Sequence, residues 1–227
     1  MPYRSGLAGV SSLMCVLDVV GSDVDHFECP RCGAHDRERH LLMYLEATGL
    51  LMAIHNAAVL HFAPEKRLSR HIIDAMPARY VRCDLFPQSS EVQRVDIQAM
   101  EFESGSFDFL IANHVLEHVV DDVQAMSEIH RVLKPNGYAI LQTPYSRKLS
   151  RTWQDPGIAD DRSRLEAYGQ EDHVRLFGRD IFDRFGATGL ASRVRQHDEL
   201  LSHLDARECG VNRAEPFFLF QRRPSNA

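Results

Sequence analysis

FDFLIANHVLEHVVDDVQAMSEIHRVLKPNGYAILQTP, residues 107–144, is the stretch of this chain that decides the fold. It begins with the apolar run 107–112, which is typical of a strand buried on both faces of a parallel sheet. Asp121 can cap a helix whose apolar residues recur at helical spacing, with Lys134 in its last turn. The Pro-Asn-Gly sequence that follows predicts a turn into a second apolar strand, 138–143. The stretch therefore predicts half of a doubly wound α/β fold.

This segment resembles class I S-adenosylmethionine-dependent methyltransferases, whose fourth strand, following helix and fifth strand typically read FDxVxxxxVLEHxxD…ExxRVLKPGGxxxxxTP. Asn136 replaces the first glycine of the family's turn, a mild change because asparagine also tolerates a positive φ. The resemblance implies a Rossmann-like α/β fold, in which a mostly parallel sheet of seven strands in the order 3-2-1-4-5-7-6 has helices on both faces. It also implies S-adenosylmethionine as the cofactor.

The cofactor turn is predicted within AAVLHFAPEKRLSRHIIDAM, residues 57–76, which reads as the first strand and helix. The family's turn is usually rich in glycine, whereas HFAPE has none. S-adenosylmethionine has no pyrophosphate, so the small Ala63 could still permit close backbone approach. A branch of the family with FAPE at this turn is similar, which implies cofactor contacts for His61, Phe62, Ala63 and Glu65. A turn that has lost cofactor binding is the alternative.

Acidic residues follow the next two expected strands. The strand 79–83 leads into Asp84, roughly 20 residues past the turn, where a Rossmann-like fold places the acceptor for ribose hydroxyls. The adjoining Leu85 is assigned to the same ligand. Asp84 as a simple cap or solvated turn residue is the alternative. A short third strand ends in Val-Asp-Ile, and the resemblance implies that Asp96 meets the adenine amino group while Ile97 packs on the ring.

The sequence NHVLEH follows the fourth strand, where the family lines its cofactor and substrate cavity. The resemblance therefore gives roles to Glu117, to Asn113 and His114 as cofactor contacts, and to His118 as a substrate contact. We favour His114 as a general base, because it stands at the carboxyl end of a parallel strand and histidine titrates near neutral pH. Alternatively, the histidines only orient the loop, since transfer from an activated sulfonium needs little more than alignment.

The polar stretch 145–178 is predicted to be a lid-like insertion. Its GQEDHVRLFGRDIFDRF sequence resembles the FGQxDHVRxYGxDxxxRL segment of the FAPE-containing branch. His173 and Arg175 are two residues apart, so an extended backbone places both on one face. We expect them, with Tyr145, to contact an acidic or hydroxylated substrate, and His173 is a second catalytic candidate. A structural cluster that joins the insertion to the body is the alternative, because arginine commonly makes multidentate contacts.

After this insertion, the apolar pattern predicts a helix over 180–186 and two final strands, 191–196 and 216–221. The second of these strands contains PFFLFQ, a continuous buried run. In this fold class, the two strands form an antiparallel edge hairpin.

Cys29 and Cys32 form a CPRCG sequence with the composition of a zinc-knuckle turn. Relatives in the same branch often carry CPxCGxxxRxR here. One CxxC supplies only two ligands, and a structural zinc site would need two more. Candidates are Cys15, His26, His35 and His40. A redox pair is less favoured, because no thioredoxin-like strand precedes the motif.

Composition adds limits to the prediction. The 227 residues, 44% of them hydrophobic, suffice for one core, so we expect an N-terminal extension over 1–50 and a methyltransferase domain over 51–227. An amphipathic helix predicted over 37–48 would cover the cofactor cleft or a partner subunit, which leaves a homodimer open. No run of 18 apolar residues or basic-apolar leader is evident, so a soluble cytoplasmic protein without a membrane partner is expected.

The formal net charge of −6 argues against broad nucleic-acid binding. The function expected from the sequence is methyl transfer from S-adenosylmethionine to an oxygen or nitrogen atom of a small-molecule acceptor. Two alternatives are kept. One is a non-catalytic S-adenosylmethionine-binding regulatory protein, and the other is a zinc-containing factor that methylates protein or RNA.

Overall fold

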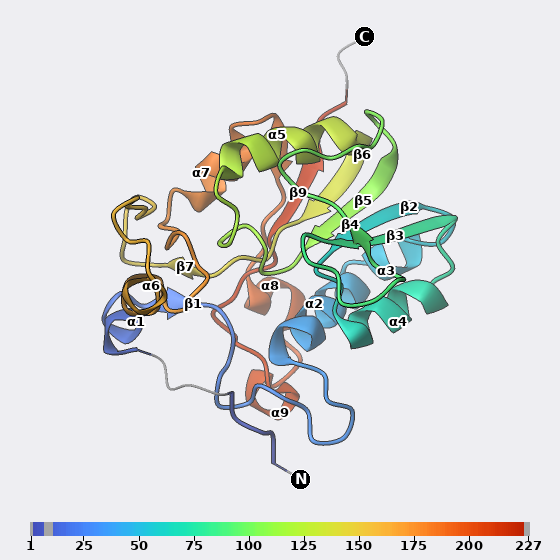
Figure 1. Ribbon diagram of the computed structural model, residues 1–227. Helices are drawn as coiled ribbons and strands as arrows, with labels where there is room; N and C mark the ends of the chain where they lie inside the picture. The colour runs from blue at the N-terminus through green and yellow to red at the C-terminus, as the bar shows by residue number, and fades with distance from the viewer. Residues whose placement is uncertain (1, 7–10, 225–227) are drawn as a thin grey trace.

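A seven-stranded sheet forms the centre of the computed structural model, which describes residues 2–6 and 11–224 (Figure 1). Its spatial order is β4-β3-β2-β5-β6-β9-β8. Counted along the chain, this is the predicted order 3-2-1-4-5-7-6, which confirms the fold. The strands are β2 (Ala58–Phe62), β3 (Arg79–Asp84), β4 (Gln93–Arg94), β5 (Phe107–Ala112), β6 (Leu133–Ile140), β8 (Leu190–Ser192) and β9 (Leu219–Arg222).

Strands β2 to β6 run parallel to one another, and β9 runs antiparallel to both of its neighbours, β6 and β8. The predicted antiparallel edge is therefore present. Consecutive side chains of a strand alternate between the two faces: Val59 lies in one hydrophobic cluster and Leu60 in the other. Both clusters are closed to solvent, which explains why the strands read as continuous apolar runs.

Helices cover both faces of the sheet (Figure 1). On one face, apolar side chains of four helices pack against the strands: α2 (Asp36–Ala47), α3 (Leu50–Ala53), α4 (Lys66–Asp74) and α8 (His197–Leu201). On the other face, the helices are α5 (Asp122–Val132) and α7 (Ile181–Gly186). Helix α2 from the N-terminal extension thus shares a core with the sheet.

The boundary between α5 and β6 differs from the prediction. The helix ends at Val132, so Lys134 belongs to β6 and not to the last helical turn. Pro135 disfavours the helical conformation of the residue before it, and Lys134 Nζ lies 2.8 Å from Asp108 Oδ2 on the neighbouring strand. Asn136 has a φ of 66°, the conformation that asparagine tolerates.

Two further strands are shorter than predicted. Strand β4 ends at Arg94, because Asp96 Oδ1 accepts from the backbone N–H of Gln98 at 2.8 Å in a turn that leaves the ladder. Strand β8 ends at Ser192 and not at Gln196, although Arg195 still forms an isolated bridge with Phe217. The predicted helix 180–186 is present as α7, with Asp180 as its N-cap.

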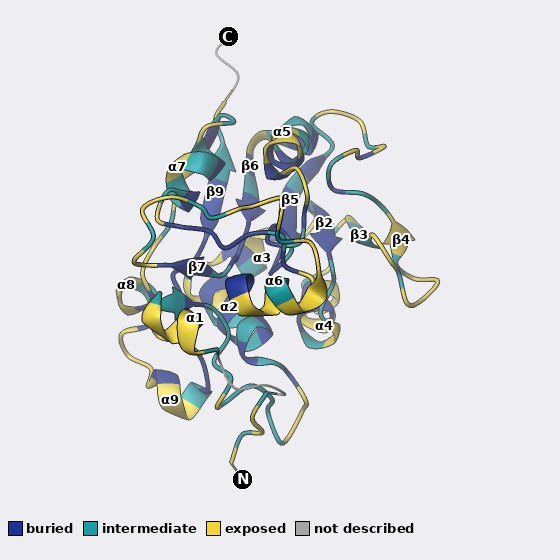
Figure 2. Cartoon of the chain, turned by 60° about the vertical axis from the view of Figure 1, so that its left-hand side comes forward, coloured by how far each residue is buried: buried dark blue, intermediate teal, exposed yellow. Residues whose placement is uncertain are grey.

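The N-terminal extension and the predicted lid pack against each other. Helix α1 (Ser12–Val16) and helix α6 (Asp161–Tyr168) share a small apolar cluster, and β1 (Val19–Val20) pairs antiparallel with β7 (Tyr145–Ser146). Figure 2 shows α1 and α6 side by side with much of their outer surface exposed. These segments form a layer beyond the carboxyl ends of the strands.

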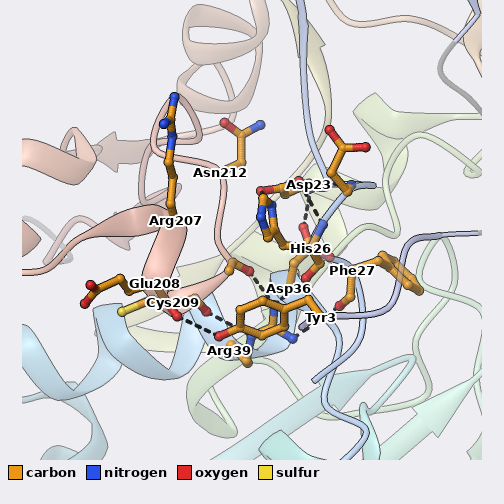
Figure 3. A network of polar contacts seen from close by, with 12 residues as sticks. Tyr3, Asp23, His26, Phe27, Asp36, Arg39, Arg207, Glu208, Cys209 and Asn212 are labelled. Carbon is orange, nitrogen blue, oxygen red and sulfur yellow. Dashed lines mark hydrogen bonds and ion pairs between the residues drawn. The ribbon is translucent and has the colours of Figure 1, made fainter. Parts of the chain in front are cut away.

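Arg39 anchors the rest of the extension (Figure 3). Its guanidinium donates to the carbonyls of His26 at 2.7 Å and Cys209 at 3.2 Å, among others, and lies 4.7 Å from the ring centroid of Tyr3. The Tyr3 hydroxyl donates in turn to the Glu208 carbonyl at 2.9 Å. This network joins the N-terminal segment to helix α9 (Ala206–Cys209).

Within residues 2–6 and 11–224, no helix has the length and apolar character that crossing a membrane requires. Residues 1 and 7–10 of the predicted extension lie outside the described part of the chain.

Candidate functional site

A pocket of about 460 Å³ opens where β2, β3 and β5 end at their carboxyl edge. Ligands of open α/β sheets bind at this edge. The pocket brings together eight of the residues predicted from the sequence, which come from the ends of β2 and β3, from the segment after β4 and from the loop between β5 and α5. They are Phe62, Ala63, Asp84, Leu85, Asp96, Ile97, His114 and His118.

Two of these residues have an unusual backbone. Ala63 and His114 adopt left-handed conformations, with φ of 46° and 53°. An L-residue in this region is strained by about 1–2 kcal/mol, and such strain is frequent at ligand sites. Ala63 thus adopts the left-handed backbone conformation that is easiest for glycine, although the turn contains no glycine. The small side chain keeps the turn open to the pocket.

One wall of the pocket combines carboxylates with apolar surface. Asp84 Oδ1 accepts from the Phe86 N–H at 2.8 Å, which fixes the carboxylate and leaves its other oxygen for a ligand. Asp96 is held by Gln98, and the next side chain, Ile97, is buried. Leu85 and Phe86 form an exposed apolar rim. A nucleoside needs hydroxyl acceptors beside an apolar surface for its ring, and this wall offers both.

His61, Glu65 and Asn113 lie behind the pocket wall. The His61 side chain is buried, with Nδ1 2.8 Å from the Tyr80 hydroxyl and Nε2 3.0 Å from Glu65 Oε2. Asn113 Nδ2 donates to the other oxygen of Glu65. Asn113 Oδ1 is buried without a hydrogen-bond partner, and Asn113 does not line the pocket.

His114 lies between two buried carboxylates. Its Nδ1 is 3.4 Å from Glu117 Oε1 and its Nε2 is 3.4 Å from Glu215 Oε1. Burial by itself lowers the pKa of His114, but the adjacent carboxylates outweigh it and raise this pKa to about 9. Burial likewise opposes ionisation of Glu215, yet its histidine neighbours lower its pKa to about 2. The geometry therefore favours a cationic His114 that hydrogen-bonds Glu215 on one side and forms an ion pair with Glu117 on the other.

Glu215, which was not predicted from the sequence, connects this site to α2 and α8. Glu215 Oε2 lies 3.1 Å from His40 Nδ1, and His40 Nε2 lies 2.9 Å from His197 Nδ1. The Tyr44 hydroxyl donates to the Glu215 carbonyl at 2.6 Å. A glutamate directly before the buried run PFFLFQ was the available clue, because a charge at the start of a buried strand needs partners.

Of the residues predicted to contact the substrate, some line the pocket and others are buried away from it. Arg175 is buried, and its guanidinium donates to the carbonyls of Leu116 at 2.9 Å and Val120 at 2.7 Å. This geometry fits the structural alternative. His173 and Tyr145 are also buried and do not line the pocket, whereas His118 does.

Cys29 and Cys32 are free thiols near the surface. In the described part of the chain, no third histidine, cysteine or carboxylate gathers with them into a cluster of ligand geometry. The predicted companions Cys15, His26, His35 and His40 are not grouped with this pair. His35 instead stacks on Phe27, with ring centroids 4.3 Å apart.

A larger, mostly polar hollow of about 880 Å³ lies between residues 22–24 and the α8–α9 region. None of the residues predicted for the site lines this hollow. We therefore assign the smaller pocket as the candidate site.

Known proteins that resemble this chain are methyltransferases or share their fold. Residues 66–141 match the family described as "Methyltransferase domain". The ubiquinone/menaquinone biosynthesis C-methyltransferase of Geotalea uraniireducens is 34% identical over 61 residues, which make up 27% of this chain and 26% of that protein. The matches cover 16% and 26% of the lengths of the two curated relatives.

Solved structures show the same fold. An S-adenosylmethionine-dependent methyltransferase from Mesorhizobium loti aligns with a TM-score of 0.53 at 16% identity, over 78% of this chain and 94% of that one. A protein named as a 4+2 cyclase also aligns with a TM-score of 0.53, at 14% identity, over 83% of this chain and 82% of that one. At these identities the likeness concerns the fold.

Proposed function

We propose that this chain, which belongs to the class I S-adenosylmethionine-dependent methyltransferases, binds S-adenosylmethionine in the 460 Å³ pocket and methylates an oxygen or nitrogen atom of a small-molecule acceptor. One observation carries the proposal: the pocket joins the left-handed Ala63 turn to the Asp84 and Asp96 carboxylates. These groups come from the ends of three different strands, and together they suit an amino-acid nucleoside.

The residues have separate parts in binding. Asp84 accepts hydrogen bonds from the ribose hydroxyls, and Asp96 accepts one from the adenine amino group, while Ile97 packs on the ring. The Ala63 turn gives the backbone close access to the methionine moiety. The sequence also predicted a structural zinc ion held by Cys29 and Cys32. Among the described residues, no further histidine, cysteine or carboxylate lies with these two thiols in a ligand cluster, so this zinc site is unsupported.

Bound S-adenosylmethionine would supply an activated methyl group: an acceptor lone pair forms the new bond as the carbon–sulfur bond breaks, sulfur keeps its electron pair, and the methylated acceptor gives up its proton to solvent on release. The protein's contribution is then to align the acceptor and exclude water, a proximity effect. His114, the predicted general base, lies between Glu117 and Glu215, and this position supports the alternative in which it orients the loop.

Isothermal titration with S-adenosylhomocysteine tests the cofactor site without a known acceptor. We expect one site per chain and a dissociation constant on the order of micromolar. Incubation with methyl-labelled S-adenosylmethionine and pools of small hydroxyl and amine compounds then tests transfer. Binding without transfer to any pool favours the regulatory alternative, and a folded sample that fails to bind rejects the proposal.

A further inference from the structure

We infer that Glu117, His118 and His173 form a binding site for a divalent first-row transition-metal ion at the edge of the pocket. Their three potential ligand atoms all lie within 4.8 Å of one another. Two imidazoles and one carboxylate are a donor set that zinc and iron(II) sites use, with coordination positions left open for other ligands. This inference goes beyond the proposed methyl transfer and does not depend on it.

Unpartnered polar atoms at this cluster point to a missing ligand. Both carboxylate oxygens of Glu117 and Nε2 of His173 are buried without a hydrogen-bond partner. The nearest charged neighbour of Glu117, His114, lies at 3.4 Å, an ion-pair distance. A buried polar atom without a partner destabilises the fold, and three of them in one cluster are unusual in a native protein. A metal ion would satisfy all three.

The two histidines are already oriented for coordination. His173 Nδ1 lies 3.0 Å from the Tyr168 carbonyl oxygen, so that Nδ1–H donates and Nε2 keeps its lone pair. His118 Nδ1 lies 3.2 Å from Asp172 Oδ2, which leaves Nε2 available. Metal-bound histidines almost always donate their second ring nitrogen to a carbonyl or carboxylate in this way.

The backbone around the cluster is rigidly connected. The Val174 N–H donates to the Glu117 carbonyl at 3.0 Å. Arg175, the next residue, donates to the Leu116 and Val120 carbonyls on either side of Glu117 and His118. Ligands from two distant parts of the sequence are therefore held in fixed relation before an ion arrives, as a metal site requires.

The position of the cluster suggests what the ion would contact. His118 and Asp172 line the pocket, so the open coordination positions lie at its wall. If the proposed methyl transfer is correct, the ion would hold an acceptor through a hydroxyl or carboxylate oxygen, because such a metal is a Lewis acid for oxygen ligands. This last step rests on the proposed function, whereas the metal site does not.

The test is a titration of the untagged full chain, stripped with a chelator, with Co²⁺ followed by visible absorption and with Zn²⁺ followed by calorimetry. We expect one ion per chain. His118→Ala and His173→Ala should each weaken binding about 100-fold or more, because loss of even an outer-shell partner of a ligand costs about 10–100-fold in metal affinity. The exposed His203→Ala should leave the affinity unchanged. His118 is partly exposed, so its variant should keep the wild-type melting temperature.

The double substitution Cys29→Ser, Cys32→Ser separates this site from the CPRCG segment, and we expect it to retain binding. Absence of binding to the wild type, binding unchanged by both histidine variants, or binding lost with the two cysteines would each overturn the inference. In the first case, the cluster is a proton-sharing network. Titration of the same stripped protein with S-adenosylhomocysteine decides the proposed function separately.

Discussion

Ala63 and His114 adopt the same left-handed backbone conformation at one edge of the sheet, just beyond two neighbouring parallel strands. Ala63 directly follows β2 and His114 comes two residues after β5. Both line the same pocket. Neither residue is glycine, so the surrounding structure must hold both conformations against their strain. Both strained residues therefore belong to the proposed cofactor site.

Two substitutions at Ala63 should distinguish the effect of backbone strain on stability from the effect of side-chain size on cofactor binding. Ala63→Gly relieves the left-handed strain of about 1–2 kcal/mol but adds about 0.4–1 kcal/mol of unfolded-state entropy. We expect unchanged or slightly increased stability in urea and unchanged affinity for S-adenosylhomocysteine. Ala63→Val should lower both, because a β-branched residue is strongly disfavoured at positive φ. Equal stabilities and equal affinities of Ala63→Gly and Ala63→Val would contradict the assigned strain at Ala63.

Asp84 should contribute to cofactor affinity through its free carboxylate oxygen. Asp84→Ala removes a charged acceptor, and we expect a loss of about 1.5–3 kcal/mol in the binding of S-adenosylhomocysteine. Asp84→Asn keeps an oxygen for the Phe86 N–H, so it isolates the effect of the charge. The exposed Glu91→Gln is the control and should bind as the wild type does. Full affinity in Asp84→Ala would exclude the ribose contact.

Arg175 should be a main determinant of stability. Arg175→Met leaves the carbonyls of Leu116 and Val120 unsatisfied and weakens the charge balance of Asp122, which lies 3.5 Å away. We expect a loss of about 3–5 kcal/mol in the free energy of unfolding. Arg162→Met removes an exposed ion pair with Glu166 and should cost at most about 0.5 kcal/mol.

Urea unfolding of Arg175→Met and Arg162→Met compares their free energies of unfolding with that of the wild type. Arg175→Lys retains the charge without the planar donors and should remain markedly destabilised. A small effect in both Arg175 variants would show that other contacts hold the loop.

Glu215 should stabilise the fold in a pH-dependent manner. Its pKa is lowered to about 2 in the folded protein, below the ordinary value of 4.5, because His40 and His114 face it. A depressed carboxyl pKa contributes stability that is complete above the unfolded value and is lost as the pH falls toward 2. The gap in unfolding free energy between wild type and Glu215→Gln should therefore be largest near pH 7 and shrink from pH 5 to pH 3.

Urea unfolding at several pH values measures this gap. Glu91→Gln, at an exposed ion pair, should show no such pH dependence. A gap that stays constant down to pH 3 would contradict the assigned ionisation of Glu215.

Local patterns explain why the sequence predicted the strands and most of the pocket. The residues that line it stand at strand ends, and in a parallel sheet these ends meet at one edge. His61 shows the limit of this reasoning, because its side chain lies on the opposite face from its neighbour Phe62. The two-residue alternation of a strand separates adjacent residues even where both belong to one motif.

The sequence by itself determined the α/β fold, the strand order implied by the family resemblance, and the acidic residues Asp84, at the end of β3, and Asp96, two residues beyond β4. Hydrophobic periodicity and turn residues act over a few positions, so they can be read without the fold. Only the tertiary structure decided that Glu215 faces His114, that Arg175 holds the loop around Glu117, and that His173 joins His118. Such contacts bring together residues tens of positions apart, and their geometry depends on how the whole chain packs.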